Sequence, residues 1–377
     1  MEKSSKPTRN YNFDLLKIVS MLMIIALHYF YRTGVANDIS FGHWSYYFLL
    51  LFESLSFVSV NCYALISGFF LAERKARPEK LVNLWFQVIF TSVACTAFTL
   101  LPQINAEDVN INTLLRTVFP VCGIHYWYIT AYFVFYLLQP FLYWVVQRIN
   151  KDQHKIICLT LVAIFSLLKT IMFFEDFTQT GGGYSFIWFI VLFFVAAYIR
   201  KYDCFNKKPA HYFLLYILFS VISFAGTVLH NYVSTEFLGG SGGGTIFLDY
   251  NSIFVFLASV FLFLCFKNLN IKKKLSKKFI GFFAPLTLGV YLIHNHLILS
   301  GWLWKNCFYS AEYIDSYKII IHFFASIIIM FIICALLDYL RQLLFKVLHI
   351  DKLAAFIASK IKSIISKIYN NKLIRKL

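Results

Sequence analysis

Three ionisable side chains interrupt the first long apolar stretch of the chain, and their types suit acid–base chemistry. The stretch covers residues 14–28 as DLLKIVSMLMIIALH, with Asp14, Lys17 and His28 among mostly Ile, Leu, Met and Val. On an α-helix, Lys17 and His28 lie within about 20° of each other and about 16 Å apart along the axis. Asp14 lies one turn from Lys17, close enough to pair with it. Ionisable groups are costly in a membrane unless they face protein or water, so these three predict a polar seam.

His28 is the candidate general base of that seam, because an imidazole accepts a proton near neutral pH. The alternative is a histidine that packs against a neighbouring helix, but polar groups inside spans more often serve function. A catalytic dyad of His28 with Asp14 is excluded, because fourteen residues of straight helix separate them by about 21 Å.

Glu53 and Asn61 are a second pair of polar residues inside an apolar stretch. They are eight residues apart and lie within about 80° on a helix. A carboxylate at membrane depth costs free energy, so we expect Glu53 either to bind the acceptor substrate of the reaction or to pair with His28. A position at the membrane interface explains Glu53 equally well, and the sequence leaves both interpretations open.

The elements that must position these residues are membrane-spanning helices. Of the 377 residues, 59% are hydrophobic and only 14% are charged, which excludes a soluble globular domain. A crossing takes about 20 residues, so we expect an all-α bundle of about ten transmembrane helices. Their approximate ranges are 14–34, 44–71, 81–101, 126–146, 156–174, 184–199, 212–232, 250–267, 281–301 and 319–340.

The distribution of basic residues predicts the orientation. The net charge of +17 comes from 35 Lys and Arg residues, most of which fall in alternate loops and in the tail. The positive-inside rule therefore places both termini in the cytoplasm, and the charge does not indicate nucleic-acid binding. We expect a transmembrane domain over residues 1–340 and a cytoplasmic tail over 341–377. The tail has apolar residues at helical spacing with lysines between them, which predicts a basic amphipathic helix on the anionic inner leaflet.

Four local patterns together resemble acyltransferase family 3, over about residues 9–340. They are Lys17 followed by ten intervening positions and His28; VSVNCYALISGFFL at 58–71 followed by Arg74 and Arg77; HYWYITAYFVFYLLQPFL at 125–142; and TLGVYLIHNHLIL at 287–299. The resemblance implies a multi-pass enzyme of the bacterial plasma membrane, in the form without an added hydrolase-like domain. Such an enzyme transfers an acyl group from acetyl-CoA or another acyl-CoA to a hydroxyl of a surface polysaccharide or lipid-linked glycan.

The resemblance also assigns roles to residues. It makes His28 the catalytic histidine and Lys17 its partner on the cytoplasmic side. Lysine stands there in place of the family's usual arginine, so the charge stays but the forked phosphate contact is lost. Arg74 and Arg77 match an arginine pair that handles the acyl donor, although positive-inside charge alone also explains them.

The remaining matches fall on the outer side of the bundle. Trp127, singled out by the third pattern, is a candidate for stacking on a sugar ring, although aromatic belts also place tryptophan there. His294, in the fourth pattern, is a candidate for the acceptor site or for support behind it. Tyr291 lies three residues before His294 on the same helix face and joins that candidate group.

Two other function classes fit an intramembrane polar seam: an exporter or flippase of a lipid-linked glycan, and a polysaccharide polymerase. The first class often shows two related halves, and no internal repeat is visible here. A polymerase would be expected to have a large outer loop, and none is expected from these spans. The partners expected are the glycan acceptor and membrane lipids, without nucleic acid or metal. The sequence leaves open which sugar accepts the group, which acyl group is transferred, and what the oligomeric state is. It also leaves open whether transfer is direct or passes through an acyl-histidine intermediate.

Overall fold

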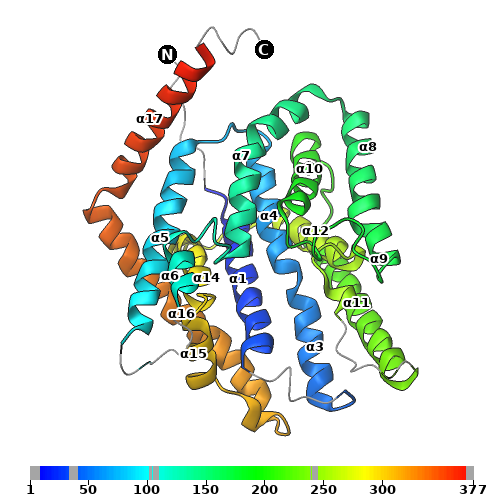
Figure 1. Ribbon diagram of the computed structural model, residues 1–377. Helices are drawn as coiled ribbons and strands as arrows, with labels where there is room; N and C mark the ends of the chain where they lie inside the picture. The colour runs from blue at the N-terminus through cyan, green and yellow to red at the C-terminus, as the bar shows by residue number, and fades with distance from the viewer. Residues whose placement is uncertain are drawn as a thin grey trace.

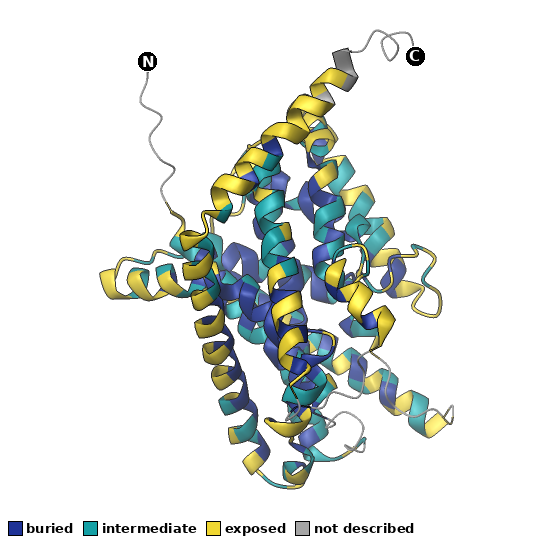
Figure 2. Ribbon diagram, turned by 60° about the vertical axis from the view of Figure 1, so that its left-hand side comes forward, coloured by how far each residue is buried: buried dark blue, intermediate teal, exposed yellow. Residues whose placement is uncertain are grey.

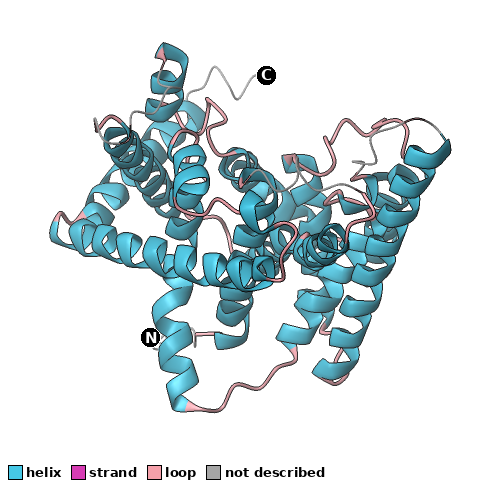
Figure 3. Cartoon of the chain, turned by 90° about the horizontal axis from the view of Figure 1, so that it is seen from below, coloured by secondary structure: helices cyan, strands magenta, loops and turns pink. Residues whose placement is uncertain are grey.

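The computed structural model describes residues 9–33, 41–101, 104, 110–237, 239 and 245–370. Within these residues the chain is helical, without a strand (Figure 3). Nine helical segments among them are long and apolar enough to cross a membrane. These segments contain α1 (Tyr11–Arg32), α3 (Trp44–Ser56) with α4 (Val58–Leu71), α5 (Pro78–Thr99), α7 (Trp127–Arg148), α8 (Lys151–Val162) with α9 (Lys169–Ile171), α11 (Pro209–Phe237), α12 (Ile253–Lys267), α13 (Lys274–Phe283) with α14 (Thr287–His294), and α16 (Lys318–Val347). The polytopic helical bundle expected from the sequence is therefore confirmed.

The sixth expected span is α10 (Phe186–Tyr202), a helix of 17 residues. Its length of about 26 Å is at the lower limit for crossing the hydrocarbon core. Most of its side chains are buried, and it packs against α4, α7 and α8. A helix enclosed by protein on several sides needs less lipid-facing length than a peripheral one.

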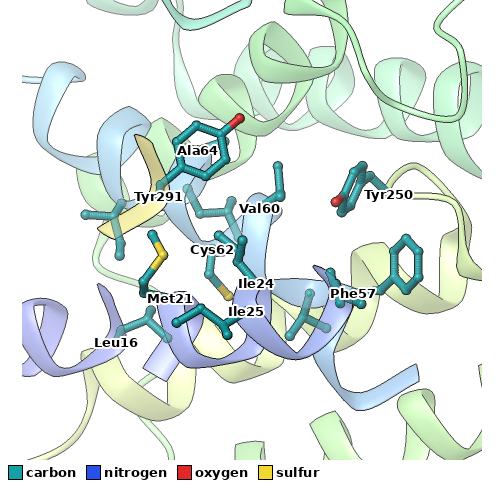
Figure 4. Packing of buried hydrophobic residues seen from close by; sticks show 14 of the residues in the cluster. Leu16, Met21, Ile24, Ile25, Phe57, Val60, Cys62, Ala64, Tyr250 and Tyr291 are labelled. Carbon is teal, nitrogen blue, oxygen red and sulfur yellow. The ribbon is translucent and has the colours of Figure 1, made fainter. Parts of the chain in front are cut away.

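Helix α1 is the centre of the bundle. It packs against α3, α4, α12, α13, α14, α15 (Leu299–Asn306) and α16. Figure 2 shows the buried residues concentrated on the inner helices, with exposed residues on the helices around them. The apolar contact of α1 with α4 includes Leu16, Met21, Ile24, Val60 and Cys62 (Figure 4). Burial of this apolar face holds α1, with its three ionisable residues, in a defined rotation.

The ninth expected span, residues 281–301, is not one continuous helix. A 3-10 turn, Ala284–Leu286, separates α13 from α14, and Pro285 at this turn has no N–H to donate to a helical hydrogen bond. Helix α14 ends at His294, and α15 begins only at Leu299. Irregular backbone at membrane depth occurs where it is enclosed by protein or lines a cavity. All but one of the α14 residues are buried, so protein encloses the irregular backbone around this helix.

The C-terminal helices meet at the end of the bundle where α1 begins (Figure 1). Helix α16 continues to Val347, past the domain boundary expected at residue 340. The amphipathic helix expected in the tail is α17 (Ile350–Asn370), and residues 371–377 lie outside the described residues. Helix α17 packs against α5. Ala354 and Ala358 are buried among those of its side chains that the structure describes, and Lys362 pairs with Glu79 at 3.6 Å.

Candidate active site

His28 and His294 form a hydrogen-bonded pair at the middle of the bundle. Nδ1 of His28 lies 2.8 Å from Nε2 of His294, across 266 residues of sequence. Helix α1 supplies the first histidine and the last residue of α14 supplies the second. The break after α14 therefore falls next to the pair, where it exposes the end of that helix to α1.

The hydrogen bonds fix the tautomer of both neutral rings. Nδ1 of His294 lies 2.6 Å from the carbonyl oxygen of Val290. A carbonyl oxygen only accepts, so Nδ1 of His294 carries the hydrogen and its Nε2 is bare. The bare Nε2 must accept from His28, which places the hydrogen of His28 on Nδ1. Nε2 of His28 is then an unprotonated nitrogen, the form that a general base requires.

Three cavities follow one another along α1, and His28 lines the central and the outer one. The central chamber, of about 60 Å³, is lined by His28 and by apolar and aromatic residues that include Trp127 and Tyr291. Figure 4 shows part of its wall, with Met21, Ile24 and Val60 beside the rings of Tyr250 and Tyr291. The His28 ring is thus enclosed by protein and faces a cavity, as the sequence predicts for a functional group.

The inner cavity, of about 650 Å³, extends from the central chamber towards the N-terminal end of α1. Tyr63, Tyr128 and Leu288 line both spaces and form the boundary between them. Lys17 lines the inner cavity, and its backbone oxygen accepts a hydrogen bond of 2.7 Å from the Tyr63 hydroxyl. The inner cavity therefore connects the charged start of the seam on α1 with the chamber beside His28.

The outer cavity, of about 230 Å³, opens on the other side of His28. His28, Leu27, Trp127 and Tyr250 line both this cavity and the central chamber. Trp127 stacks on Tyr250, with ring centroids 5.8 Å apart and an interplanar angle of 28°. Such an aromatic wall beside polar groups suits a sugar, which presents apolar ring faces and hydroxyl edges.

Arg32 and His125 contribute polar groups to the outer cavity. Arg32 follows His28 by one helical turn, and its Nη2 donates to Oδ1 of Asn295 at 3.3 Å. Nε2 of His125 accepts from the backbone N–H of Leu297 at 3.3 Å. Burial lowers the pKa of His125 to about 4. His125 is therefore neutral at physiological pH, with the hydrogen on Nδ1.

The N-terminal end of the seam is an ion-pair cluster. Oδ1 of Asp14 accepts from Lys17 at 3.0 Å, and Oδ2 accepts from Nε of Arg9 at 2.6 Å. The pairing of Asp14 with Lys17 expected from the sequence is present. Asp14 thus fixes the Lys17 ammonium at the wall of the inner cavity and lies far from His28.

Arg74 and Arg77 are exposed and do not line the inner cavity. The chain around them is held by backbone contacts: Gln139 donates to the Arg74 oxygen at 2.8 Å, and the Tyr136 hydroxyl accepts from the Arg77 N–H at 2.9 Å. Both guanidinium groups interact electrostatically with Lys80, which does line the cavity. The arginine pair therefore lies outside the cavity wall but near one of its cations.

Glu53 and Asn61 have partners other than His28. Oε1 of Glu53 accepts from the Tyr31 hydroxyl at 2.6 Å, so Glu53 lies behind a residue of the outer cavity. The partner position of His28 at Nδ1 is taken by His294, which contradicts the suggested pairing with Glu53. Asn61 is fully buried and joins three elements. It donates to the Tyr250 oxygen and to Ser259, and it accepts from the Trp188 indole at 2.8 Å.

Sequence reasoning missed several residues of the cavity walls. Arg32 is one turn from His28, so helical spacing alone could have found it. Asp338 and Arg341, three residues apart at the end of the last apolar span, are an acid and a base on one helix face. Tyr63 and Tyr250 gave no signal, because tyrosines are frequent in this chain and their position depends on packing.

Comparison with known proteins agrees with this geometry. A family model described as an acyltransferase domain matches residues 10–339, which is most of the chain. No curated protein and no solved structure matches the chain. The match begins at the cap of α1 and ends within α16, so it includes all residues that line the three cavities except Arg341 and Phe345 of the inner cavity. The chain is a multi-pass membrane protein and belongs to acyltransferase family 3.

Proposed function

We propose that this chain is an O-acyltransferase of the bacterial plasma membrane. It moves an acyl group, acetyl in the simplest case, from acyl-CoA to a hydroxyl of a surface polysaccharide or lipid-linked glycan. The donor occupies the inner cavity with its thioester in the central chamber, and the acceptor occupies the outer cavity. The observation that carries the proposal is the unprotonated Nε2 of His28, whose ring lies where the central chamber meets the outer cavity.

The transfer proceeds by direct attack. Nε2 of His28 takes the proton of the acceptor hydroxyl while the hydroxyl oxygen attacks the thioester carbonyl carbon. The tetrahedral intermediate collapses with cleavage of the carbon–sulfur bond, and the imidazolium returns the proton to the departing thiolate. The products are an O-ester and free coenzyme A, so protons and electrons balance. His294 accepts the Nδ1–H of His28 throughout and stabilises the transient imidazolium.

The other predicted residues fit supporting roles. Lys17 places a positive charge in the donor cavity, and Asp14 holds it there. Trp127 and Tyr291 line the chamber in which thioester and hydroxyl meet. Arg74 and Arg77 remain candidates for guiding the anionic donor towards the cavity, since they lie near Lys80. Asn61 and Glu53 act behind the walls, through Tyr250 and Tyr31.

The test uses purified wild-type protein, acetyl-CoA labelled in the acetyl group, and glycan extracted from the envelope of the source cells. We expect alkali-labile label on the glycan and release of one thiol for each ester formed. An exporter, a flippase or a polymerase would transfer no label. Label that stays on the protein after acid quenching, at the level of one group per chain, would replace direct attack by an acyl-histidine intermediate.

A further inference from the structure

The inner cavity has a strongly one-sided charge. Among the residues that line it, Lys17, Lys80 and Arg341 are cationic and none carries a carboxylate. The other lining residues are aliphatic, aromatic or uncharged polar. A cavity of about 650 Å³ is in the size range of small-molecule sites. Its charge therefore predicts an anionic ligand.

Arg341 is built into the wall rather than attached to its surface. Its Nε donates to Oδ1 of Asp338 at 2.6 Å and its Nη2 donates to Oδ2 at 3.2 Å. The Asp338 side chain is 1% exposed and that of Arg341 is 10% exposed. Gln342 also donates to Asp338, at 3.2 Å. The carboxylate thus fixes one edge of the guanidinium and leaves its other N–H groups free of Asp338.

A glycine on the facing helix makes room for this carboxylate. Gly289 belongs to α14, and a Cβ atom added there would overlap the Asp338 side chain. On the other side of Arg341, its guanidinium carbon lies 4.8 Å from the centroid of the Phe345 ring. Phe345 lines the inner cavity as well. Arg341 is therefore held in a defined orientation by a carboxylate and an aromatic ring.

Lys80 lines the same cavity as Arg341 but belongs to another helix. It lies in the first turn of α5, whereas Arg341 lies on α16, and both line the same space. Lys80 forms no ion pair with any of the residues that the structure describes. A forked guanidinium and a lysine that line one cavity are groups that suit phosphate oxygens.

We propose that Arg341 and Lys80 bind the phosphate groups of the acyl donor, and that Asp338 is the positioning residue for Arg341. The donor is then a nucleotide-bearing thioester, with its phosphates between α5 and α16 and its arm directed along α1 to His28. This inference rests on the proposed function. It moves the main phosphate contacts from Arg74 and Arg77 to two residues that line the cavity.

The experiment measures equilibrium binding of coenzyme A, 4′-phosphopantetheine and pantetheine to the full-length protein in lipid nanodiscs. All variants carry His28→Ala, so binding is recorded without chemistry. Arg341→Gln and Lys80→Gln should each raise the Kd for coenzyme A about 10- to 100-fold, the loss of one charge-assisted hydrogen bond. The Kd for pantetheine, which has no phosphate, should change less than about twofold by the same reasoning.

Three further variants separate the site from general charge and from folding. Lys346→Gln removes a charge from the same helix at an exposed residue outside the cavity, and its Kd should match that of the parent. Arg341→Lys keeps the positive charge but loses the forked guanidinium. Its Kd for coenzyme A should therefore lie between that of the parent and that of Arg341→Gln. Asp338→Asn keeps the shape without the charge and should weaken coenzyme A binding without affecting pantetheine.

The outcomes distinguish this inference from the proposed function. Unchanged coenzyme A affinity in Arg341→Gln and Lys80→Gln overturns the inference, while acyl transfer by the wild-type enzyme would leave the proposed function intact. An equal loss of affinity for coenzyme A and for pantetheine also overturns the inference, because the two residues would then act through the fold and not through phosphate contacts. Equal affinity for 4′-phosphopantetheine and coenzyme A excludes nucleotide recognition and indicates a carrier-protein donor. No coenzyme A binding by the parent overturns both proposals.

Discussion

Replacement of His294 tests the tautomer argument most closely. His294→Ala removes the acceptor of the His28 Nδ1–H and leaves that hydrogen without a protein partner beside the position of the fully buried His294. The His28 ring can then place its hydrogen on either nitrogen, and only the tautomer with bare Nε2 can take a proton from the acceptor. His294→Gln puts an amide oxygen near the lost Nε2 and is the matched control.

The expected size of the effect follows from the lost interaction. An unsatisfied buried donor costs about 1–3 kcal/mol, and the lost hydrogen bond also stabilised the imidazolium that forms in the transition state. With 1.36 kcal/mol for each factor of ten, His294→Ala should lower kcat about 5- to 150-fold. The donor KM should change little, since His294 lines none of the three cavities. His294→Gln should regain a large part of the lost rate.

The assay is steady-state transfer of labelled acetyl groups by purified enzyme, with thermal unfolding in detergent as the check on folding. A kcat equal to wild type in His294→Ala would refute the tautomer argument. Equal loss in His294→Ala and His294→Gln, with lowered melting temperatures in both, would reduce His294 to a packing residue.

Three further predictions concern the acceptor side and the framework behind it. Trp127→Ala should raise the acceptor KM about 2- to 10-fold, the value of an aromatic contact, with the donor KM unchanged; a selective rise in donor KM would contradict the assignment of the outer cavity. Gly183→Ala should lower the melting temperature more than Gly181→Ala. Both glycines have positive φ, but a Cβ at Gly183 would lie 2.9 Å from Cβ of Tyr250 whereas Gly181 faces open space; equal melting temperatures would contradict this. Asn61→Leu leaves buried partners unpaired and should destabilise the bundle by about 2–4 kcal/mol; an unchanged melting temperature would show that the three hydrogen bonds of Asn61 contribute little.

Sequence spacing predicted the features of the site that depend on the geometry of a single helix. The rotation that places Lys17 and His28 on one face follows from 3.6 residues per turn, and both residues line the chain of cavities. The contact of Asp14 with Lys17 follows from the same geometry. Composition likewise predicted a helical membrane bundle, because the apolar content of a segment reflects the solvent around it.

The other features of the site depend on packing between helices that are far apart in the sequence. The partner of His28 lies 266 residues away, and only the break after α14 brings His294 to it. A hydropathy window treats residues 281–301 as one span, because it does not register that Pro285 interrupts the helix or that the chain leaves it after His294. The exposure of Arg74 and Arg77, and the burial of Asp338 against Gly289, depend on neighbouring helices that sequence spacing does not describe.

The central claim is that His28 activates a hydroxyl at the junction of the central chamber and the outer cavity. Single-turnover transfer from labelled acetyl-CoA to glycan, compared between wild type and His28→Ala at equal amounts of folded protein, tests it most directly. The account predicts that wild type transfers label, whereas His28→Ala binds coenzyme A with normal affinity and transfers at least about 100-fold more slowly, the usual contribution of a general base. Transfer by His28→Ala at the wild-type rate would contradict the account.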